Sequence, residues 1–377
     1  MRGKGIRAII TALLVLIPAL LLLSPMLSAT SLQPKPAGAS IPEFSEELEQ
    51  RAKSSFPFKS FFGQLRLNLL LFSGQQEQNG IFINSSGLLR RIDQPDNAVI
   101  AHNIETINFF ADEARAWGKP VFVTALPSAA AIYRQNLPPF SSTVNQRQYI
   151  DDIMAGISGH ATAVNMYSHL DSHRRQYIYY RTEDNLTSLG GFYVYSNLIS
   201  RMLNIEPPSL RNYNLTYPVR GYYGDLYQIS PYNEVEPDTL TLFHYTSYDR
   251  EYTITHSSLT TRKTYHTLYP EHLAALGNET DIFLGGLSAI TDIGSSAPYT
   301  RKLLVFGDKS ALAYAPFLAN HYRQLTIVDL FNPELTISDI SLQDYTQVLF
   351  AYNAEVLMTK ELPAELLIER VLPTVGE

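Results

Sequence analysis

The sequence predicts an α/β domain in which helices cover a parallel β-sheet, with a β-rich insertion and one transmembrane helix at the N-terminus. Three observations support this prediction. Helical and strand periods alternate from residue 103 onward, a strand–helix–strand unit occupies residues 303–330, and a long apolar run follows the first cations of the chain. Strands that alternate with helices are typical of parallel sheets, because the crossover between parallel strands is usually a helix.

The N-terminal leader is the clearest signal. Arg2, Lys4 and Arg7 precede an apolar run over residues 8–29, which at about 1.5 Å per residue is long enough to cross a hydrocarbon core. The cations should stay in the cytoplasm, so the rest of the chain should be exported and held at the cell membrane by a single span. Residues 27–29 (Leu-Ser-Ala) also suit a signal-peptide cleavage site, so an anchor and a cleaved signal both remain open.

Composition limits the function classes. The 377 residues carry a net charge of −7 and no run of Lys and Arg, which argues against a nucleic-acid partner. Cysteine is absent, so disulfides, thiol nucleophiles and thiolate metal sites are excluded. We expect no cofactor.

Residues 30–41 are rich in Pro, Ser, Gly and Ala and are predicted to form a linker, so the folded domain should span residues 42–377. Within it, residues 221–252 are rich in Tyr and alternate as β-hairpins do. The rings of this insertion, Tyr222 and Tyr223 among them, suit stacking on sugars. The alternative is that they only pack the insertion against the sheet.

The elements are assigned in chain order. Asn103 is expected to cap a helix that ends at Gly118, and residues 121–126 form a buried strand. Further helices are expected at about 189–203, 311–322 and 341–346, and further strands at 303–306, 325–330 and 348–352.

The turn Gly307-Asp308-Lys309-Ser310 is the expected place for chemistry, because ligands in open α/β sheets bind beyond the carboxyl ends of the strands. A strand–turn–helix junction of this kind exposes a nucleophilic serine in many hydrolases. Here Lys309 takes an early position in the turn. A cation at a helix N-terminus is mildly disfavoured unless a carboxylate compensates it.

Six separated motifs carry a family resemblance. They are Pro-Ser-Ala-Ala-Ala-Ile at 127–132, Leu-Pro-Pro at 137–139, Tyr-Arg-Thr at 180–182 with Thr187 and Gly190, Phe-Leu-Gly-Gly at 283–286, Pro-Phe-Leu at 316–318 with His321 and Tyr322, and Val-Asp-Leu at 328–330. With them the chain from about 44 to 358 resembles the bacterial DHHW family, a membrane-anchored relative of alginate O-acetyltransferase-like SGNH proteins. The resemblance implies a three-layer SGNH-hydrolase-like fold.

The same resemblance places the family's catalytic residues on altered positions. The family's run Arg-Thr-Asp-His-His-Trp-Thr corresponds to residues 181–187, so the triad Asp falls on Glu183 and the triad His on Asn185. The oxyanion-binding Asn falls on Leu287, and the nucleophile falls on Lys309. An amide cannot act as a general base near neutral pH, leucine donates no hydrogen bond to an oxyanion, and a lysine acylated as an amide is not turned over. We therefore expect a pseudoenzyme.

We expect the altered positions to hold a charge pair, because the four-carbon arm of Lys309 should reach the carboxylate of Glu183 or Asp184. Ser310 is the fallback nucleophile, with Asp308 or Asp184 beside it. Its side chain is turned by about 100° along the helix and would need a new base, for which His256 and His321 are candidates. Ligand binding at this end of the sheet is assigned to Arg181, Gly285, Gly286, Gly307, Tyr222 and Tyr223.

Two other clusters receive structural interpretations. His169 and His173, with Asp171 between them, have the i, i+4 spacing of metal ligands, but no further ligand lies nearby in sequence. A polar helix face is preferred, and no metal site is predicted. The acidic pair Glu183 and Asp184 resembles the paired carboxylates of glycosidases, but no second acidic partner can be assigned.

The sequence thus predicts a membrane-anchored, extracytoplasmic SGNH-like protein without ordinary catalytic residues. Its expected role is binding or accessory, in cell-envelope or exopolysaccharide metabolism, with a polysaccharide or a membrane acyltransferase as partner; this substrate class rests on the resemblance alone. The alternatives are an active carbohydrate esterase or O-acetyltransferase that uses Ser310 or another constellation, and a purely structural scaffold.

Overall fold

The computed structural model describes residues 67–372, apart from 140, 158, 248 and 336–339. Residues 67–72 are helical, and the residues from 75 onward form a unit of their own. The predicted leader, the linker and the start of the domain at 42 lie outside the described residues. Among the residues that are described, no helix combines the length and the apolar character that a membrane span requires.

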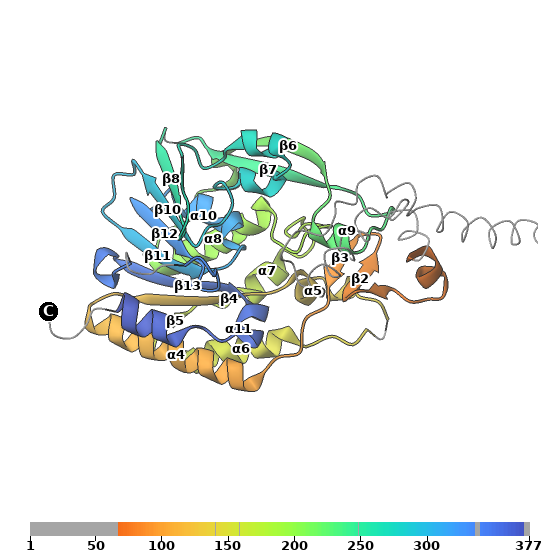
Figure 1. Ribbon diagram of the computed structural model, residues 1–377, viewed down its shortest axis with the longest axis horizontal. Coiled ribbons are helices and arrows are strands. Elements are labelled where there is room, and N and C mark those ends of the chain that lie inside the picture. The colour runs from red at the N-terminus through yellow and green to blue at the C-terminus, as the bar shows by residue number, and fades with distance from the viewer. Residues whose placement is uncertain (1–66, 140, 158, 248, 336–339, 373–377) are drawn as a thin grey trace, which may run out of the picture. The chain divides into compact units, whose positions relative to one another are not determined.

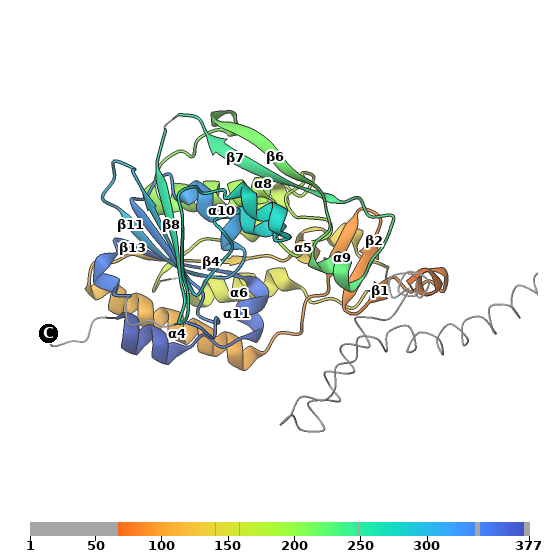
Figure 2. The ribbon, with the colours of Figure 1, turned by 45° about the horizontal axis from the view of Figure 1, so that its top comes forward.

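A mixed sheet forms the centre of the second unit (Figures 1 and 2). Its strands lie in the order β5-β4-β13-β11-β12-β10-β8-β9. Their bounds are β4 (Val121–Leu126), β5 (Thr162–Ala163), β8 (Tyr252–Ser257), β9 (Arg262–Tyr265), β10 (Ile290–Ser295), β11 (Lys302–Gly307), β12 (Gln324–Val328) and β13 (Gln347–Asn353). The first five in spatial order pair in parallel, as predicted.

The other edge of the sheet corrects the prediction. β10 runs antiparallel to β12, and β8 and β9 continue antiparallel beyond it. Between β9 and β10 the chain forms only the 3-10 turns Glu271–Leu276 and Glu279–Ile282. Antiparallel neighbours need no crossover helix, so the alternation of helices and strands could not reveal these three strands.

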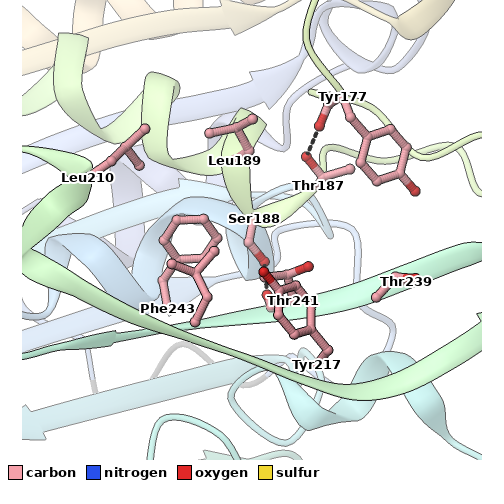
Figure 3. Close-up of a pocket in the computed structure, with 10 residues that line it drawn as sticks. Tyr177, Thr187, Ser188, Leu189, Leu210, Tyr217, Thr239, Thr241 and Phe243 are labelled. Carbon is pink, nitrogen blue, oxygen red and sulfur yellow. Dashed lines mark hydrogen bonds between the residues drawn. The ribbon is translucent and has the colours of Figure 1, made fainter.

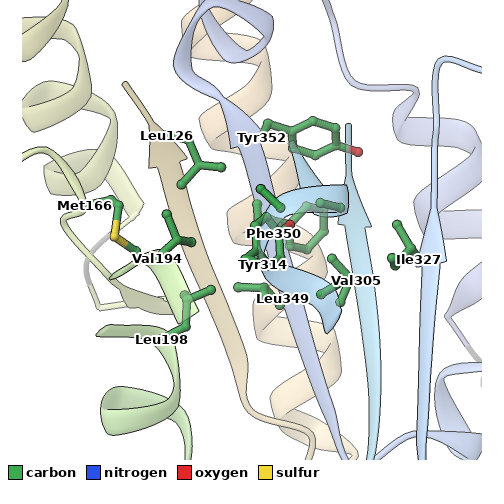
Figure 4. Packing of buried hydrophobic residues seen from close by; sticks show 14 of the residues in the cluster. Leu126, Met166, Val194, Leu198, Val305, Tyr314, Ile327, Leu349, Phe350 and Tyr352 are labelled. Carbon is green, nitrogen blue, oxygen red and sulfur yellow. The ribbon is translucent and has the colours of Figure 1, made fainter. Parts of the chain in front are cut away.

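Helices cover both faces of the sheet, which gives the layering that the resemblance implied (Figure 1). α4 (Asn97–Ala116), α6 (Gln146–Ile157) and α11 (Ala354–Thr359) lie on one face, and α8 (Ser188–Leu203) and α10 (Ala311–Leu318) on the other. Shorter helices are α5 (Ala129–Ile132), α7 (Tyr167–Ser172) and α9 (Asp225–Ile229). Figure 4 shows Val194 and Leu198 of α8 and Tyr314 of α10 packed against buried side chains of the parallel strands, and all three are fully buried.

The crossing of α8 with its neighbours depends on two glycines. A Cβ on Gly191 would lie 1.9 Å from the carbonyl oxygen of Ala313, and a Cβ on Gly190 would lie 2.1 Å from that of Ile178. Both distances are far below van der Waals contact, so the backbones approach closely only because these side chains are absent. The N-terminus of α8 is thereby fixed beside α10, next to the turn that was predicted to carry the chemistry.

Several predicted element bounds hold and others shift. β4 matches exactly, and α8 begins one residue early. α4 begins at Asn97, capped by the Asp96 carboxylate, and not at Asn103. Asn103 is buried and donates to the carbonyl oxygens of Leu357 (3.0 Å) and Lys360 (2.8 Å), so a tertiary contact explains a residue that looks like a cap.

Two predicted helices near the C-terminus are shorter than expected. α10 ends at Leu318 instead of residue 322, and the chain turns there before β12. The helix predicted at about 341–346 is the 3-10 turn Leu342–Asp344. Each of these segments must reach the next parallel strand within a few residues, which leaves little room for a longer helix.

The β-rich insertion begins earlier than predicted. It is a two-stranded antiparallel ribbon of β6 (Tyr213–Tyr222) and β7 (Asp238–Tyr245), with α9 between the strands. β8, placed partly in the insertion by sequence, belongs to the main sheet. β6 was not predicted because it contains Pro218, and proline normally argues against a strand. Here Pro218 lies at a register shift between Thr216 and Val219, where proline is tolerated. A small sheet of β1 (Glu77–Gln78), β2 (Ile81–Asn84) and β3 (Gly87–Arg90) completes the unit.

Candidate functional site

The predicted turn leaves β11 at the carboxyl edge of the parallel strands and enters α10. Gly307 ends β11, where a Cβ would lie 2.9 Å from the carbonyl oxygen of Ala351 on β13, so a side chain there would crowd the neighbouring strand. Asp308, Lys309 and Ser310 follow, and α10 begins at Ala311. The turn therefore holds Lys309 at the edge of the sheet where ligands of α/β proteins commonly bind.

A second loop, residues 180–186, faces this turn. Its ends are joined by an isolated bridge between Tyr179 and Leu186. Asp238, which is fully buried, holds its first residues: the carboxylate accepts from the backbone N–H groups of Arg181 (2.8 Å) and Thr182 (2.9 Å), and from the hydroxyls of Thr182 and Tyr177. A carboxylate with this many donors is a rigid anchor, so the direction of the next residue, Glu183, is fixed.

Lys309 and Glu183 form the predicted ion pair. The ammonium of Lys309 lies 2.8 Å from Oε1 of Glu183. The Glu183 side chain is 3% exposed, and its other oxygen accepts from the Tyr222 hydroxyl (3.0 Å) and from the backbone N–H of Asp225 (2.9 Å). Lys309 is 49% exposed and has a second, longer contact of 3.7 Å to Asp225. The carboxylate is thus buried and fully bonded, and its cation is open to solvent.

The electrostatics of this pair favour the charged forms. Burial alone would raise the pKa of Glu183, but the attraction of Lys309 and the hydrogen bonds from Lys309, Asp225 and Tyr222 outweigh it and lower the pKa. For Lys309, burial alone would lower the pKa, but the carboxylates of Glu183, Asp225 and Asp281 raise it above its usual value. A lysine that stays protonated has no free electron pair with which to attack a carbonyl.

Asp184 does not share in this pair. Its carboxylate lies 2.6 Å from the guanidinium of Arg90 on β3. Burial raises the pKa of Asp184 in spite of that cation. The two adjacent acids therefore point to different partners, which explains why only one of the two predicted contacts of Lys309 forms.

Asn185 has a structural role. Its amide nitrogen donates to the backbone oxygen of Lys309 (3.3 Å), and its amide oxygen accepts from the N–H of Leu186 (2.8 Å). The bond to Lys309 connects the two loops, and an amide in this place cannot accept a proton from a hydroxyl.

Ser310, the fallback nucleophile, is bonded within its own turn. It is 7% exposed, and its hydroxyl donates to Asp308, which also accepts from the backbone N–H groups of Ser310 (2.9 Å) and Asn353 (2.6 Å). Burial raises the pKa of Asp308, although these hydrogen bonds oppose the change. The arrangement is that of a helix start closed by an aspartate, and Asp308 would be the nearest proton acceptor.

The two candidate bases are engaged elsewhere. His256 bonds to the carbonyl oxygen of Leu284 (2.8 Å), and its pKa is lowered by burial. His321 bonds to the Tyr195 hydroxyl (2.6 Å), and burial lowers its pKa to about 4. Neither bond involves Ser310, so the structure does not bring these histidines to the turn.

The predicted oxyanion loop is a tight turn. Leu284, Gly285 and Gly286 have φ values of 59°, 84° and 89°, a left-handed run that glycine adopts most readily. A Cβ on Gly285 would lie 2.4 Å from the ring of Tyr265. Leu287 packs against the hydrophobic core. The glycines therefore have a sufficient structural reason, and leucine supplies no donor.

The other predicted residues are distributed over the surface around the site. Arg181 lies over the Tyr177 ring at 4.5 Å, and the Tyr223 ring lies 4.1 Å from that of Tyr227. Of the aromatic residues predicted to bind, Tyr222 reaches the ion pair. The rings of His169 and His173 lie 5.2 Å apart at the end of α7, and within the described residues no group of His, Asp or Glu side chains is arranged to hold a metal ion.

The site residues that sequence did not indicate are Asp225, Asp238 and Arg90. Each meets its partner across a long stretch of chain, and none lies in a motif. A cavity of about 160 Å³ lies beside the turn, lined in part by Asp184, Asn185, Asp308, Lys309, Ser310 and Asn353. The geometry thus combines a cavity at the sheet edge with a cation at the position where the resemblance places the nucleophile.

A family model described as DHHW protein matches residues 106–328, a segment that contains both loops of this site. The chain belongs to the DHHW family. No curated protein matches it in sequence.

Solved structures share the fold of this DHHW family member. A DHHW family protein from Eubacterium siraeum is 20% identical, with a TM-score of 0.59 over 79% of this chain and 97% of that one. Bacillus cereus PatB1, solved with a sulfonyl adduct, is 15% identical, with a TM-score of 0.61 over 75% and 96%. The O-acetyltransferase domain of Pseudomonas putida AlgJ is 13% identical, with a TM-score of 0.46 over 75% and 93%. The likeness to the first two structures, at these identities, establishes the fold and not the activity.

Proposed function

We propose that this DHHW family member is a membrane-anchored, extracytoplasmic protein that has lost acyl-transfer chemistry and has a binding or accessory role in cell-envelope or exopolysaccharide metabolism. The observation that supports the loss of chemistry is the 2.8 Å pair between Lys309 and Glu183. By the family resemblance, this pair takes the positions of the nucleophile and the triad acid.

Three physical arguments support an inactive site. The pKa of Lys309 is raised, so its ammonium has no electron pair to donate at neutral pH. The carboxylate of Glu183 is saturated by donors and has no imidazole to orient. Asn185, at the position of the base, is used in joining the two loops. Ordinary Ser-His-Asp catalysis needs all the roles that these residues have given up.

The second candidate function is an esterase or O-acetyltransferase that uses Ser310. One observation favours it: the Ser310 hydroxyl bonds to Asp308, whose pKa is raised, beside a cavity of about 160 Å³. Against it, the hydroxyl is almost buried, and Asp308 also accepts from the backbone N–H groups of Ser310 and Asn353, which stabilise its carboxylate in a structural role.

Hydrolysis of a chromogenic acetyl ester by the full chain separates the two functions. We expect no turnover above the rate of buffer, in the original chain and in Ser310→Ala alike. Turnover that Ser310→Ala abolishes, while Ser86→Ala on an exposed turn leaves it unchanged, would establish the second candidate. A screen for glycan binding then tests the proposed role directly.

The anchor in this proposal rests on residues 8–29. We expect the chain to stay in the membrane fraction after alkaline carbonate washing and to leave it when residues 1–29 are replaced by a cleavable signal. Release of the original chain by carbonate would contradict the anchored form.

A further inference from the structure

A pocket of about 330 Å³ lies apart from the turn at Lys309, between the β6–β7 ribbon and the N-terminus of α8 (Figure 3). Its size is at the lower end of the range for small-molecule sites, so it suits one short ligand and not a polymer. Neither the family resemblance nor the proposed function assigns any role to it.

One face of the ribbon forms the floor of the pocket. Thr239, Thr241 and Phe243 alternate along β7 and share a face, as side chains two residues apart on a strand do. Leu215 on β6 is the cross-strand partner of Phe243, and Tyr217 follows it on the same face. The rings of Tyr217 and Phe243 and the Leu215 side chain make this floor apolar.

The opposite wall has hydroxyl groups that are already bonded. Thr187 donates to the carbonyl oxygen of Tyr177 (2.7 Å), a bond drawn in Figure 3, and Ser188 donates to that of Thr241 (2.5 Å). The Tyr177 hydroxyl donates to Asp238. Among the described residues that line the pocket, none carries a carboxylate, an amide or an ammonium group. A sugar ring placed here would face a mainly apolar lining and could reach few hydroxyls besides those of Tyr217, Thr239 and Thr241, so several of its own hydroxyls would lack partners, which is costly.

The rim of the pocket carries a cation. The guanidinium of Arg220 lies 5.6 Å from the ring of Tyr217, and Arg220 is the cross-strand partner of Thr239. Tyr217 and Leu215 are 48% and 42% exposed, so the apolar floor continues out to the surface beside this cation. The arrangement fits a molecule that is apolar along its length and anionic at one end.

From this geometry we infer that the pocket binds a single medium-length aliphatic acyl chain, with its carboxylate at Arg220. The inference stands independently of whether the turn at Lys309 is active, because the pocket shares none of the charged residues of that site. It assigns the chain a lipid-like ligand in addition to any polysaccharide partner.

A photo-crosslinking competition tests the inference on the full chain. The probe is decanoate with a diazirine in its alkyl chain, and mass spectrometry locates the label. Labelling is expected in the peptides that contain Leu189, Leu210 and Leu215. Unlabelled hexanoate, octanoate and decanoate should compete about fourfold better for each added methylene, as burial of about 0.8 kcal/mol per CH₂ requires, until the pocket is full.

Matched variants separate this pocket from non-specific adsorption. In Leu215→Glu, unlabelled decanoate should compete with the probe about tenfold or more weakly, because the new carboxylate faces the apolar chain of the ligand. Leu259→Glu, at a leucine that is 72% exposed and does not line the pocket, should leave it unchanged. In Arg220→Gln, decanoate should compete with the probe several-fold more weakly at low salt, and the competition should no longer depend on the salt concentration.

Any of the following results would overturn the inference: label that maps elsewhere on the chain, affinity that rises with chain length without a plateau, or equal binding by the two Leu→Glu variants. The location of the label and the chain-length series use the unaltered chain, so the inference stays testable even if a variant fails to fold. A free sugar that competes as well as decanoate would also contradict it.

Discussion

Replacing Lys309 by methionine would leave the carboxylate of Glu183 buried without its cation. Methionine keeps most of the length of the side chain, so the change removes the charge and little packing. Glu183 is 3% exposed and cannot regain water, but it keeps its bonds from Tyr222 and Asp225. Lys309→Met should therefore lower the free energy of unfolding.

The expected loss is set by two features of the pair. Breaking a fully buried ion pair costs about 3–5 kcal/mol. The Lys309 side chain is 49% exposed, so solvent already screens part of its attraction, and the two remaining hydrogen bonds hold the lone carboxylate. We expect a loss of about 2 kcal/mol at pH 7, below the value for a fully buried pair. The exposed pair of Arg147 and Asp151, with side chains 53% and 48% exposed, is the control, and Arg147→Met should cost less than about 0.5 kcal/mol.

The double variant sharpens the test. Glu183→Gln removes the buried charge, so Lys309→Met with Glu183→Gln should be more stable than Lys309→Met alone. Urea unfolding followed by the fluorescence of Trp117, the only tryptophan of the chain, measures all four proteins. A Lys309→Met variant as stable as Arg147→Met, or a double variant less stable than Lys309→Met, would refute the reasoning.

The pH dependence has a definite sign. In the original chain the pKa of Glu183 is lowered, so its contribution to stability is present above the unfolded value of about 4.3 and is lost as the pH falls through the folded pKa. In Lys309→Met, burial acts without the cation and should raise that pKa. Protonation then relieves the lone charge, so the stability difference between the two proteins should shrink as the pH falls from 7 toward 4.

Three further predictions follow from the fold. Gly191→Ala should lower the free energy of unfolding, measured with urea, by about 3 kcal/mol, because the new Cβ would meet a backbone oxygen of α10. The control is Gly156→Ala, which should cost less than about 1 kcal/mol because its Cβ would meet only the side chain of a flexible isoleucine. Asp238→Ala should cost about 3 kcal/mol by the same measurement, since it removes the acceptor of four donors, two of them buried on Thr182, and near-neutral stability would show that the loop is held otherwise. His321 should titrate by NMR at about pH 4, so stability should fall as the pH drops from about 6.5 toward 4; a midpoint near 6.5 would contradict its burial.

Local sequence patterns predicted the parallel half of the sheet well. The strand at 121–126, the helix at 189–203 and the unit around β11 and β12 have strong apolar patterns, and β11 and β12 are joined by one helix. β8, β9 and β10 were missed because they carry many polar residues and pair antiparallel, with no crossover helix between them. Asn103 was read as a cap because a buried amide and a capping amide are identical in sequence.

The candidate site, like the fold, was predictable from the sequence only in part. The pairing of Lys309 with Glu183 was predictable, since the resemblance gave both positions and a cation at a helix start needs a carboxylate. The choice of Glu183 over Asp184 was not, because it depends on Arg90 and Asp225, which the fold brings in from other elements. Asp238 was not predictable either, since its donors lie more than fifty residues away.

The central claim is that this turn contains no nucleophilic serine, and reaction with a sulfonyl fluoride tests it most directly. The full chain is incubated with phenylmethylsulfonyl fluoride at neutral pH and its intact mass is measured, with an active serine hydrolase as the positive control. We predict that the mass stays unchanged while the control gains one sulfonyl group. A stoichiometric adduct that peptide mapping places on Ser310 would contradict the account.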